Sequence, residues 1–334
     1  MITGEESPPD SRQRGATDAV LRQRRAAVTA AIELSGLTKS FGDVRAVDDI
    51  NAVIESGEVT AFLGPNGAGK TTTLRMLLGL VMPTSGTATF GGRRYDELPD
   101  PLRHVGAMLE ASGYHPGRTA LDHLRVLTTA AKLDTDAPMR VLAATGLAED
   151  ARRRVGEFSL GMRQRLGLAA ALLGDPAVLI LDEPTNGLDP QGIRWLRGYL
   201  RQLAGEGRTV LVSSHALSEV EQTADHVLLI AKGRLVRSST LTALRAEAGV
   251  GCRVRTPQPE RLSTLLDATG HRHRHIDGEL AVDAAAEQVG ELAAAHGVVL
   301  HRLTATAGLE EAFFRLTEQP GRVNDAVSLE GASA

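Results

Sequence analysis

The chain has 334 residues, of which 42% are hydrophobic and 23% charged, a composition that allows a substantial buried core. Its 37 basic and 41 acidic residues give a formal net charge of −4, which argues against binding nucleic acid through phosphate neutralisation alone. The single cysteine, Cys252, excludes a disulfide within the chain and suits a reducing cytoplasm. No 18 consecutive residues are apolar, so we expect any membrane spans to belong to another chain.

The first 31 residues are rich in Pro, Ser, Arg and Asp and have little periodic apolar pattern. We expect a flexible N-terminal tail over 1–31, with at most a short helix around Ala19–Ala27. No internal repeat is evident further along the chain.

From Ile32 to about Leu241, short apolar runs alternate with helical patterns. This alternation predicts an α/β domain over 32–241 with a mainly parallel sheet covered on both faces. The stretch 108–173 has a mainly helical pattern and is interpreted as a helical insertion. The clearest elements are strands at Val59–Leu63, Ala177–Leu181, Thr209–Ser213 and Val227–Ala231, and a helix at Thr71–Leu80.

The pattern changes again after about Leu241, and 242–334 is predicted to form a small C-terminal α+β module with a flexible end. The order of its elements is β-α-β-β-α-β, which is typical of a ferredoxin-like fold. Three histidines, His271, His273 and His275, alternate with arginine and indicate an exposed edge strand rather than a metal site. The predicted elements are strands at Gly251–Arg255, His271–His275, Glu279–Val282 and Val298–Leu303, and helices at Pro259–Ala268, Asp283–Ala295 and Leu309–Leu316, with the hairpin turn at Asp277-Gly278.

A glycine-rich segment follows the strand at Val59–Leu63. Its glycines allow consecutive backbone N–H groups to converge on phosphate oxygens, and the next helix points its positive end at the same oxygens. We expect Lys70 to neutralise the charge of β- and γ-phosphates and the hydroxyl of Thr71 to bind Mg²⁺. The segment fits the pattern G-x-x-x-x-G-K-[ST] and reads Gly64-Pro65-Asn66-Gly67-Ala68-Gly69-Lys70-Thr71, with Thr72 next in the predicted nucleotide site.

Two acids, Asp182 and Glu183, end the buried strand that begins at Ala177. Ligands of α/β proteins bind at the C-terminal ends of parallel strands. Asp182 is therefore predicted to hold Mg²⁺, directly or through water, and Glu183 to polarise the attacking water as a general base. An apolar strand ending in Asp-Glu is by itself weak support for a site; the phosphate loop upstream strengthens it.

Between these two motifs, residues 158–165 read Phe-Ser-Leu-Gly-Met-Arg-Gln-Arg and begin an apolar helix. This segment resembles the LSGGQ signature of ABC (ATP-binding-cassette) transporter ATPases. The resemblance covers about 32–241 and implies a P-loop NTPase core with an N-terminal antiparallel β subdomain. The family's positions fall on Ser159 and Gly161 (signature), Phe41 (stacking on adenine), Asp189 in the Asn186–Asp189 D-loop, and His215 (switch histidine).

The resemblance also implies a mechanism with ATP and Mg²⁺ as cofactors. Two ATPase subunits, identical or different, meet head to tail, and each ATP lies between one P-loop and the partner's signature. The Ser159 hydroxyl and the Gly161 N–H would contact the partner's γ-phosphate. Closing and opening of this dimer would drive an integral-membrane permease on a separate chain. The protein is then expected to be cytoplasmic and peripheral on the inner face of the cell membrane.

The segment Val105–Glu110 departs from the family at its end, because most members have the glutamine of the Q-loop there. A glutamate at this place, with Leu160 and Met162 in the signature, resembles the ATPases of bacitracin-resistance and lantibiotic-immunity exporters. We predict that Glu110 contacts the attacking water and Mg²⁺ and couples hydrolysis to the permease. The alternative is an exposed acid at the start of a helix.

The leading hypothesis is therefore the ATPase subunit of an exporter of a drug, antibiotic or peptide. A soluble ABC ATPase acting on ribosomes or DNA is the second. Ribosome-acting members usually carry two cassettes, and DNA-repair members have a long coiled coil that does not fit within Thr71–Glu157. An importer ATPase is the third, and the departures at Glu110 and Leu160 argue mildly against it. No nucleic-acid partner is expected, and the cargo is not encoded in this chain.

Overall fold

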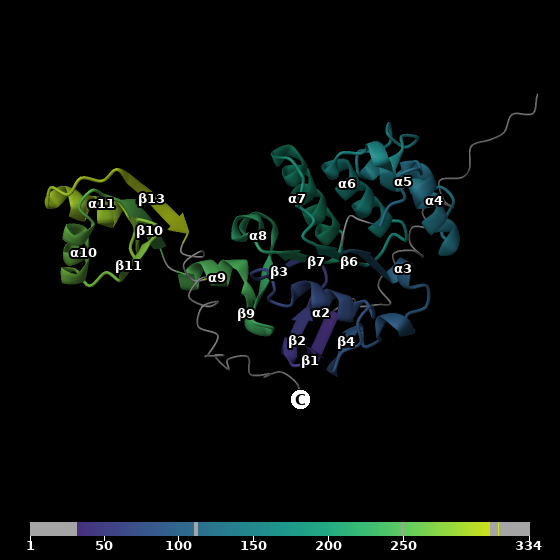
Figure 1. The fold of residues 1–334 in the computed structure, drawn as a ribbon, viewed down its shortest axis with the longest axis horizontal. Coiled ribbons are helices and arrows are strands. Elements are labelled where there is room, and N and C mark those ends of the chain that lie inside the picture. The colour runs from purple at the N-terminus through teal and green to yellow at the C-terminus, as the bar shows by residue number, and fades with distance from the viewer. Residues whose placement is uncertain (1–31, 110–112, 249, 308–312, 314–334) are drawn as a thin grey trace, which may run out of the picture. The chain divides into compact units, whose positions relative to one another are not determined.

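The computed structural model describes residues 32–109, 113–248, 250–307 and Phe313 (Figure 1). Its contacts divide the chain into two compact units. The first holds the chain up to Thr60 together with Thr71–Ser213, and the second holds Ala61–Lys70 together with the chain from Ser214 onward. Several predicted features lie outside the described residues: the tail at 1–31 with its helix around Ala19–Ala27, Glu110, all of Leu309–Leu316 except Phe313, and the flexible end of the chain.

An antiparallel sheet begins the first unit, drawn in purple and blue in Figure 1. Its strand order is β2 (Val44–Ile54), β1 (Ile32–Phe41), β4 (Ser85–Phe90), and both pairings are antiparallel. Every second residue near the start of β1 is buried, as expected for a sheet with one face on a core. The antiparallel β subdomain implied by the resemblance is thus confirmed.

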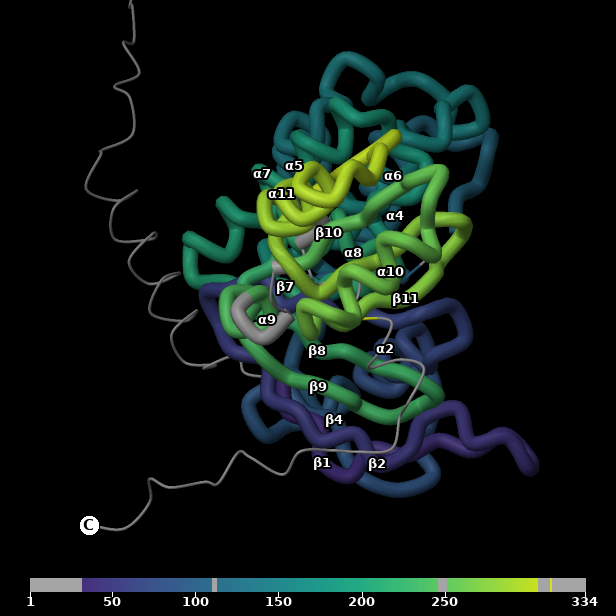
Figure 2. The backbone as a smooth tube through the Cα atoms, turned by 90° about the vertical axis from the view of Figure 1, so that its left-hand side faces the viewer, coloured from purple at the N-terminus to yellow at the C-terminus, as the bar shows by residue number. Residues whose placement is uncertain are grey.

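A larger sheet follows the order β5-β6-β7-β3-β8-β9. Strands β5, β6 and β7 are parallel, whereas β8 and β9 pair antiparallel and run side by side (Figure 2). All five residues of β3 and of β6 are buried, which explains their continuous apolar sequences. The bounds are β3 Val59–Leu63, β5 Val105–Met108, β6 Val178–Asp182, β7 Thr209–Ser214, β8 His226–Ala231 and β9 Arg234–Thr240.

Helices follow most strands of this sheet. In the stretch predicted to be helical, α4, α5 and α6 share one core, in which Leu124, Leu142 and Leu166 are fully buried. A Cβ atom on Gly106 of β5 would lie 2.0 Å from the carbonyl oxygen of Ala171, so α6 packs directly on the strand backbone. The helix bounds are α2 Lys70–Leu77, α3 Pro101–His104, α4 Ala120–Ala130, α5 Ala137–Ala144, α6 Leu160–Ala171, α7 Pro190–Gly205, α8 Leu217–Thr223 and α9 Leu241–Ala248, with 3₁₀ turns at Tyr95–Glu97 and Val155–Glu157.

The C-terminal module forms a four-stranded sheet of order β11-β12-β10-β13, in which all neighbours are antiparallel. Its two helices alternate with the strands as a ferredoxin-like fold requires, so the predicted β-α-β-β-α-β order is confirmed. Asp277 (φ 50°) and Gly278 (φ 78°) form the predicted tight hairpin turn. The bounds are β10 Val250–Arg255, α10 Pro259–Ala268, β11 His273–Ile276, β12 Glu279–Val282, α11 Ala286–Ala295 and β13 Arg302–Ala307.

One strand of this module was predicted too early in the chain. The sequence indicates a strand at Val298–Leu303, but β13 begins only at Arg302. The reason is that Val298 ends helix α11: its N–H donates to the carbonyl of Ala293 (2.9 Å), and its side chain is buried. Among the described residues of the whole chain, no helix is both long and apolar enough to cross a membrane.

Candidate functional site

The glycine-rich segment connects the buried strand β3 to helix α2. Gly67 (φ 79°) and Gly69 (φ 105°) lie in conformations that favour glycine, which lets the loop turn its N–H groups inward. Gly64 is restricted by space instead, because a Cβ there would lie 2.3 Å from the carbonyl oxygen of Ile230. The fixed glycines of the motif are thus required by backbone geometry. The other loop residues are Pro65 and Asn66, which are exposed, and Ala68, which is buried.

Lys70 is the first residue of α2 and is only 6% exposed. Its Nζ donates to the carbonyl oxygens of Gly64 (2.7 Å) and Pro65 (3.3 Å), so the ammonium group lies within the curve of the loop. A buried ammonium beside converging N–H groups at a helix start is suited to bind phosphate.

Oxygen atoms from three elements meet at the C-terminal end of β6. Asp182 accepts a hydrogen bond on Oδ2 from the hydroxyl of Thr71 (2.7 Å) and another on Oδ1 from the hydroxyl of Ser213. Asp182 is 8% exposed and Ser213 is fully buried. A carboxylate and a threonine hydroxyl are ligands that Mg²⁺ prefers, so these residues fit that ion. Sequence reasoning missed Ser213, although its place at the end of β7 was a usable signal.

Glu183 follows Asp182 in a left-handed backbone conformation (φ 48°). For a residue other than glycine this conformation costs about 1–2 kcal/mol. Its N–H donates to the Ser213 hydroxyl (2.9 Å), which helps to hold the turn. The backbone of half-buried Glu183 is thus held next to the residue predicted to bind Mg²⁺. The structure brings Thr71, Asp182, Glu183 and Ser213 together.

The signature forms the exposed start of α6. Ser159 is its N-cap, and the serine Oγ accepts from the N–H of Met162 (3.2 Å). The guanidinium of Arg163 donates to the carbonyl of Phe158 (3.1 and 3.2 Å), whose ring is buried. Ser159 is exposed and Gly161 half-buried, so the serine, unlike the buried Phe158, is accessible from outside the unit.

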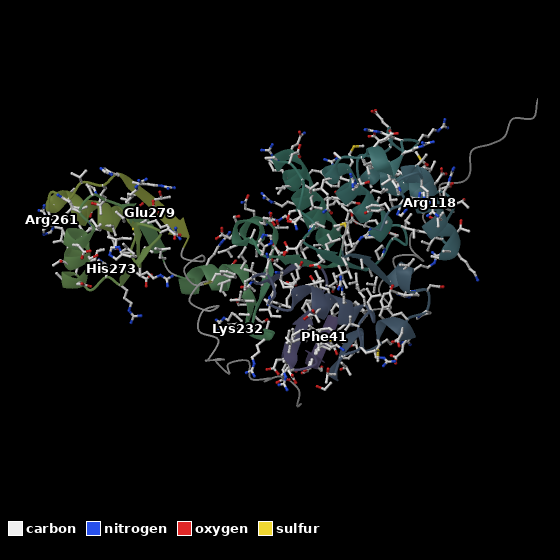
Figure 3. The ribbon with its side chains drawn as sticks, in the orientation of Figure 1. Phe41, Arg118, Lys232, Arg261, His273 and Glu279 are labelled. Atoms are coloured by element: carbon white, nitrogen blue, oxygen red, sulfur yellow. The ribbon has the colours of Figure 1, made fainter. Side chains whose placement is uncertain are left out.

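Two titratable side chains pack against each other beside α6, and one of them donates a hydrogen bond to the helix. Tyr114 donates its hydroxyl to the carbonyl of Arg163 (3.2 Å), and its ring meets that of His123 edge to face at 5.0 Å. Burial raises the pKa of Tyr114 to about 12. Burial, and secondly the charge of Arg118 (labelled in Figure 3), lowers the pKa of His123. Both side chains are therefore neutral near pH 7.

The remaining predicted positions lie on other elements. Asp189 caps α7, with its Oδ1 accepting from the N–H of Gly192 (2.6 Å). His215 is exposed, directly after β7. Phe41 (labelled in Figure 3) ends β1 and is 52% exposed. The ammonium of Lys39 lies 5.0 Å from its ring centre. Thr72 lies half-buried in α2.

Comparison with known proteins identifies this arrangement. A family model described as "ABC transporter" matches residues 47–186. The bacitracin transport ATP-binding protein BcrA of Bacillus licheniformis is 45% identical over 208 residues, which cover 61% of this chain and 68% of that protein. The chain belongs to the ABC transporter ATP-binding family. The lantibiotic transport ATP-binding protein SrtF of Streptococcus pyogenes is 41% identical over 205 residues, or 61% of this chain and 89% of SrtF.

Other relatives of this ABC protein extend further along the chain. The Nod factor export ATP-binding protein I of Burkholderia lata is 36% identical over 300 residues, which cover 86% of this chain and 97% of that protein. A solved ATP-binding subunit of an ABC transporter is 28% identical, with a TM-score of 0.59, over 65% of this chain and 92% of its own. A second family model, a domain of unknown function (DUF8746), matches residues 251–310 in the C-terminal module. The chain is thus an ABC ATPase whose C-terminal part matches a second family model.

Proposed function

We propose that this ABC protein is the ATP-hydrolysing subunit of an exporter and that it drives a permease on a separate chain. The observation that carries the proposal is the set of hydrogen bonds around Asp182, which joins the first helix after the P-loop to the ends of β6 and β7. The names of the relatives, which refer to bacitracin, lantibiotics and Nod factor export, support export of a drug, antibiotic or peptide.

In this proposal the residues of the P-loop, 64–72, hold the phosphates of ATP, and Lys70 neutralises their charge. Thr71 and Asp182 would hold Mg²⁺, which supplies further charge neutralisation when bound. Glu183 accepts a proton from the attacking water as general base. The supporting observations are the buried ammonium of Lys70 and the fixed left-handed turn at Glu183.

The other predicted contacts complete the proposed site. Phe41 stacks on adenine, which its 52% exposure allows. His215 acts in catalysis as the switch histidine, and Glu110 contacts the attacking water and Mg²⁺. Glu110→Ala tests the last role: unchanged ATPase activity and unchanged export would contradict it.

The exposed signature supports a head-to-tail dimer of two identical or two different subunits. Ser159 and Gly161 would bind the ATP held by the partner subunit, with Asp189 beside them. We further propose three parts, a tail at 1–31, the ATPase domain at 32–241 and an accessory module at 242–334, and a place on the inner face of the cell membrane.

Glu183→Gln offers the direct test, because it removes the general base and keeps the phosphate contacts. The tagged variant is purified from its native host with Mg·ATP in mild detergent. We expect a polytopic membrane protein without its own P-loop to copurify. The matched control, Glu183→Gln combined with Lys70→Ala, should not form the ATP-bound dimer. Ribosomes or DNA without a membrane protein would overturn the proposal in favour of a soluble ABC ATPase.

A further inference from the structure

The signature of this chain has a leucine, Leu160, where the LSGGQ motif has its first glycine, and this leucine lies against the D-loop of the same subunit. A Cβ atom on Gly187 would lie 2.2 Å from Cδ2 and 2.4 Å from Cγ of Leu160. Real Cβ atoms essentially never come that close to another heavy atom. Leu160 therefore occupies the side of Gly187 on which any other residue would carry its side chain.

The contact continues along the first turn of α6. A Cβ atom on Gly161 would lie 3.5 Å from the carbonyl oxygen of Gly187 and 3.6 Å from Cδ2 of Leu188, both ordinary van der Waals distances. Leu188 and Met162 in turn pack against the main core of the unit. The start of α6 and the D-loop thus face each other over several residues.

Leu160 itself is not a core residue, because 54% of its surface is exposed. It follows the cap of α6, Ser159, and it touches the loop that leads to the cap of α7, Asp189. A half-exposed leucine between two helix starts contributes little burial. Its position instead limits how far the two helix starts can shift relative to each other.

We propose that Leu160 is a positioning residue that links the signature to the D-loop within one subunit. The proposal rests on the proposed function, in which both segments face the ATP bound by the partner. With glycine at this place, the D-loop could move towards α6 without a clash. With leucine, such a movement of Gly187 must first displace the Leu160 side chain, so the movements of the signature and the D-loop are coupled when the dimer closes.

The contact is tested first by thermal unfolding of the full chain without nucleotide. The variants are Leu160→Ala, Gly187→Ala and the two combined. Gly207→Ala is the control, because Gly207 has a similar left-handed conformation (φ 88°, against 79° at Gly187) and a Cβ added there would meet no atom within 4 Å. Gly187→Ala should lower Tm more than Gly207→Ala does, and adding Leu160→Ala should restore Tm to the control's level. Equal losses in both glycine variants, with no restoration, would contradict the contact.

The positioning role is tested by steady-state ATPase activity. Leu160→Ala should lower kcat by about three- to tenfold and leave KM for ATP unchanged, because the P-loop is untouched. Gly187→Ala should lower kcat further than Leu160→Ala does. The kcat of the double variant should recover to that of Leu160→Ala, and the kcat of Leu160→Met should remain near the wild-type value. A wild-type kcat in Leu160→Ala would overturn the role. A wild-type chain without ATPase activity would instead overturn the proposed function. The Tm values of the two single variants and the double variant would still test the contact between Leu160 and Gly187.

Discussion

Two helix starts in this protein are proposed to bind phosphate, and they differ in how far each is enclosed by its own subunit. The start of α2 is enclosed: Lys70 is 6% exposed and hydrogen-bonded to its own loop, and Gly64 admits no side chain. The start of α6 is open: Ser159, which caps the first turn, and Leu160 are both exposed.

This difference indicates which phosphate contacts a subunit could make without a partner. An enclosed site with a buried ammonium has its geometry fixed before any ligand arrives. An exposed, capped helix start offers N–H groups and a dipole but no enclosure, so a second surface must complete it. The structural contrast therefore agrees with the proposed division of labour, in which α2 holds a subunit's own ATP and α6 the partner's.

Lys70→Ala should break the enclosed start and has the largest expected effect. We expect the ATPase rate to fall by about 10²–10³-fold, the range found when one preorganised donor to a transition state is removed. Nucleotide affinity, measured by titration with a fluorescent ATP analogue, should fall as well. Arg140→Ala, at an exposed arginine, is the control and should change neither quantity. Normal hydrolysis by Lys70→Ala would contradict the proposed site.

Ser159→Ala should impair the open start of α6 and leave the enclosed start of α2 unchanged. We expect about 10- to 100-fold lower ATPase activity, since a hydrogen bond to a charged group contributes about 1.5–3 kcal/mol. Binding of ATP to the monomer should stay normal. The loss of the cap itself should lower the unfolding free energy by about 1 kcal/mol. Thr119→Ala is the matched control, because Thr119 caps α4 as Ser159 caps α6. This variant should lose stability and keep its ATPase activity. Equal activity in the two variants would count against the signature's role.

Ser213→Ala tests how far the enclosed site depends on the hydroxyl that holds its two acids in place. Its hydroxyl donates to Asp182 and accepts from the N–H of Glu183, so both acids lose a fixed partner. We expect about tenfold lower kcat, in keeping with about 1–3 kcal/mol for an unsatisfied buried group, and a higher Mg²⁺ requirement in a titration of activity against the metal. Ser218→Ala, at an exposed serine, serves as the control. An unchanged Mg²⁺ requirement would show that Ser213 only packs.

His123→Phe tests how α6 is supported and has the smallest expected effect. Because the pKa of His123 is lowered in the folded state, the unfolded chain binds a proton first as pH falls. Stability should therefore decrease as pH falls below the ordinary histidine pKa of about 6.5. The phenylalanine variant keeps a ring against Tyr114 and should show a flatter slope of urea midpoint between about pH 7.5 and 5.5. An unchanged slope would assign the pH dependence to other groups.

The sequence predicted the enclosed start well because its determinants are local. The glycines, Lys70 and the buried strand β3 are adjacent in the chain, and each is required by backbone geometry or burial. The ferredoxin-like order was also predictable from periodicity and from the Asp277-Gly278 turn. The place of Ser213 at the end of a strand was a usable signal, but its partners Asp182 and Glu183 and the contact of Leu160 with Gly187 were not predictable, since they depend on which distant segments meet. The predicted start of the last strand at Val298 was wrong, because the N–H of Val298 donates to the carbonyl of Ala293 at the end of α11.

The strand order of the C-terminal module leaves β11 at one edge of its sheet. An edge strand offers unpaired backbone groups on which strands of other molecules can assemble. Here that strand has only four residues and includes His273, Arg274 and His275. A short strand with bulky, polar side chains is a poor template for such growth. The alternating histidines and arginines of β11 are thus side chains of the kind that disfavour pairing of this edge with strands of other molecules.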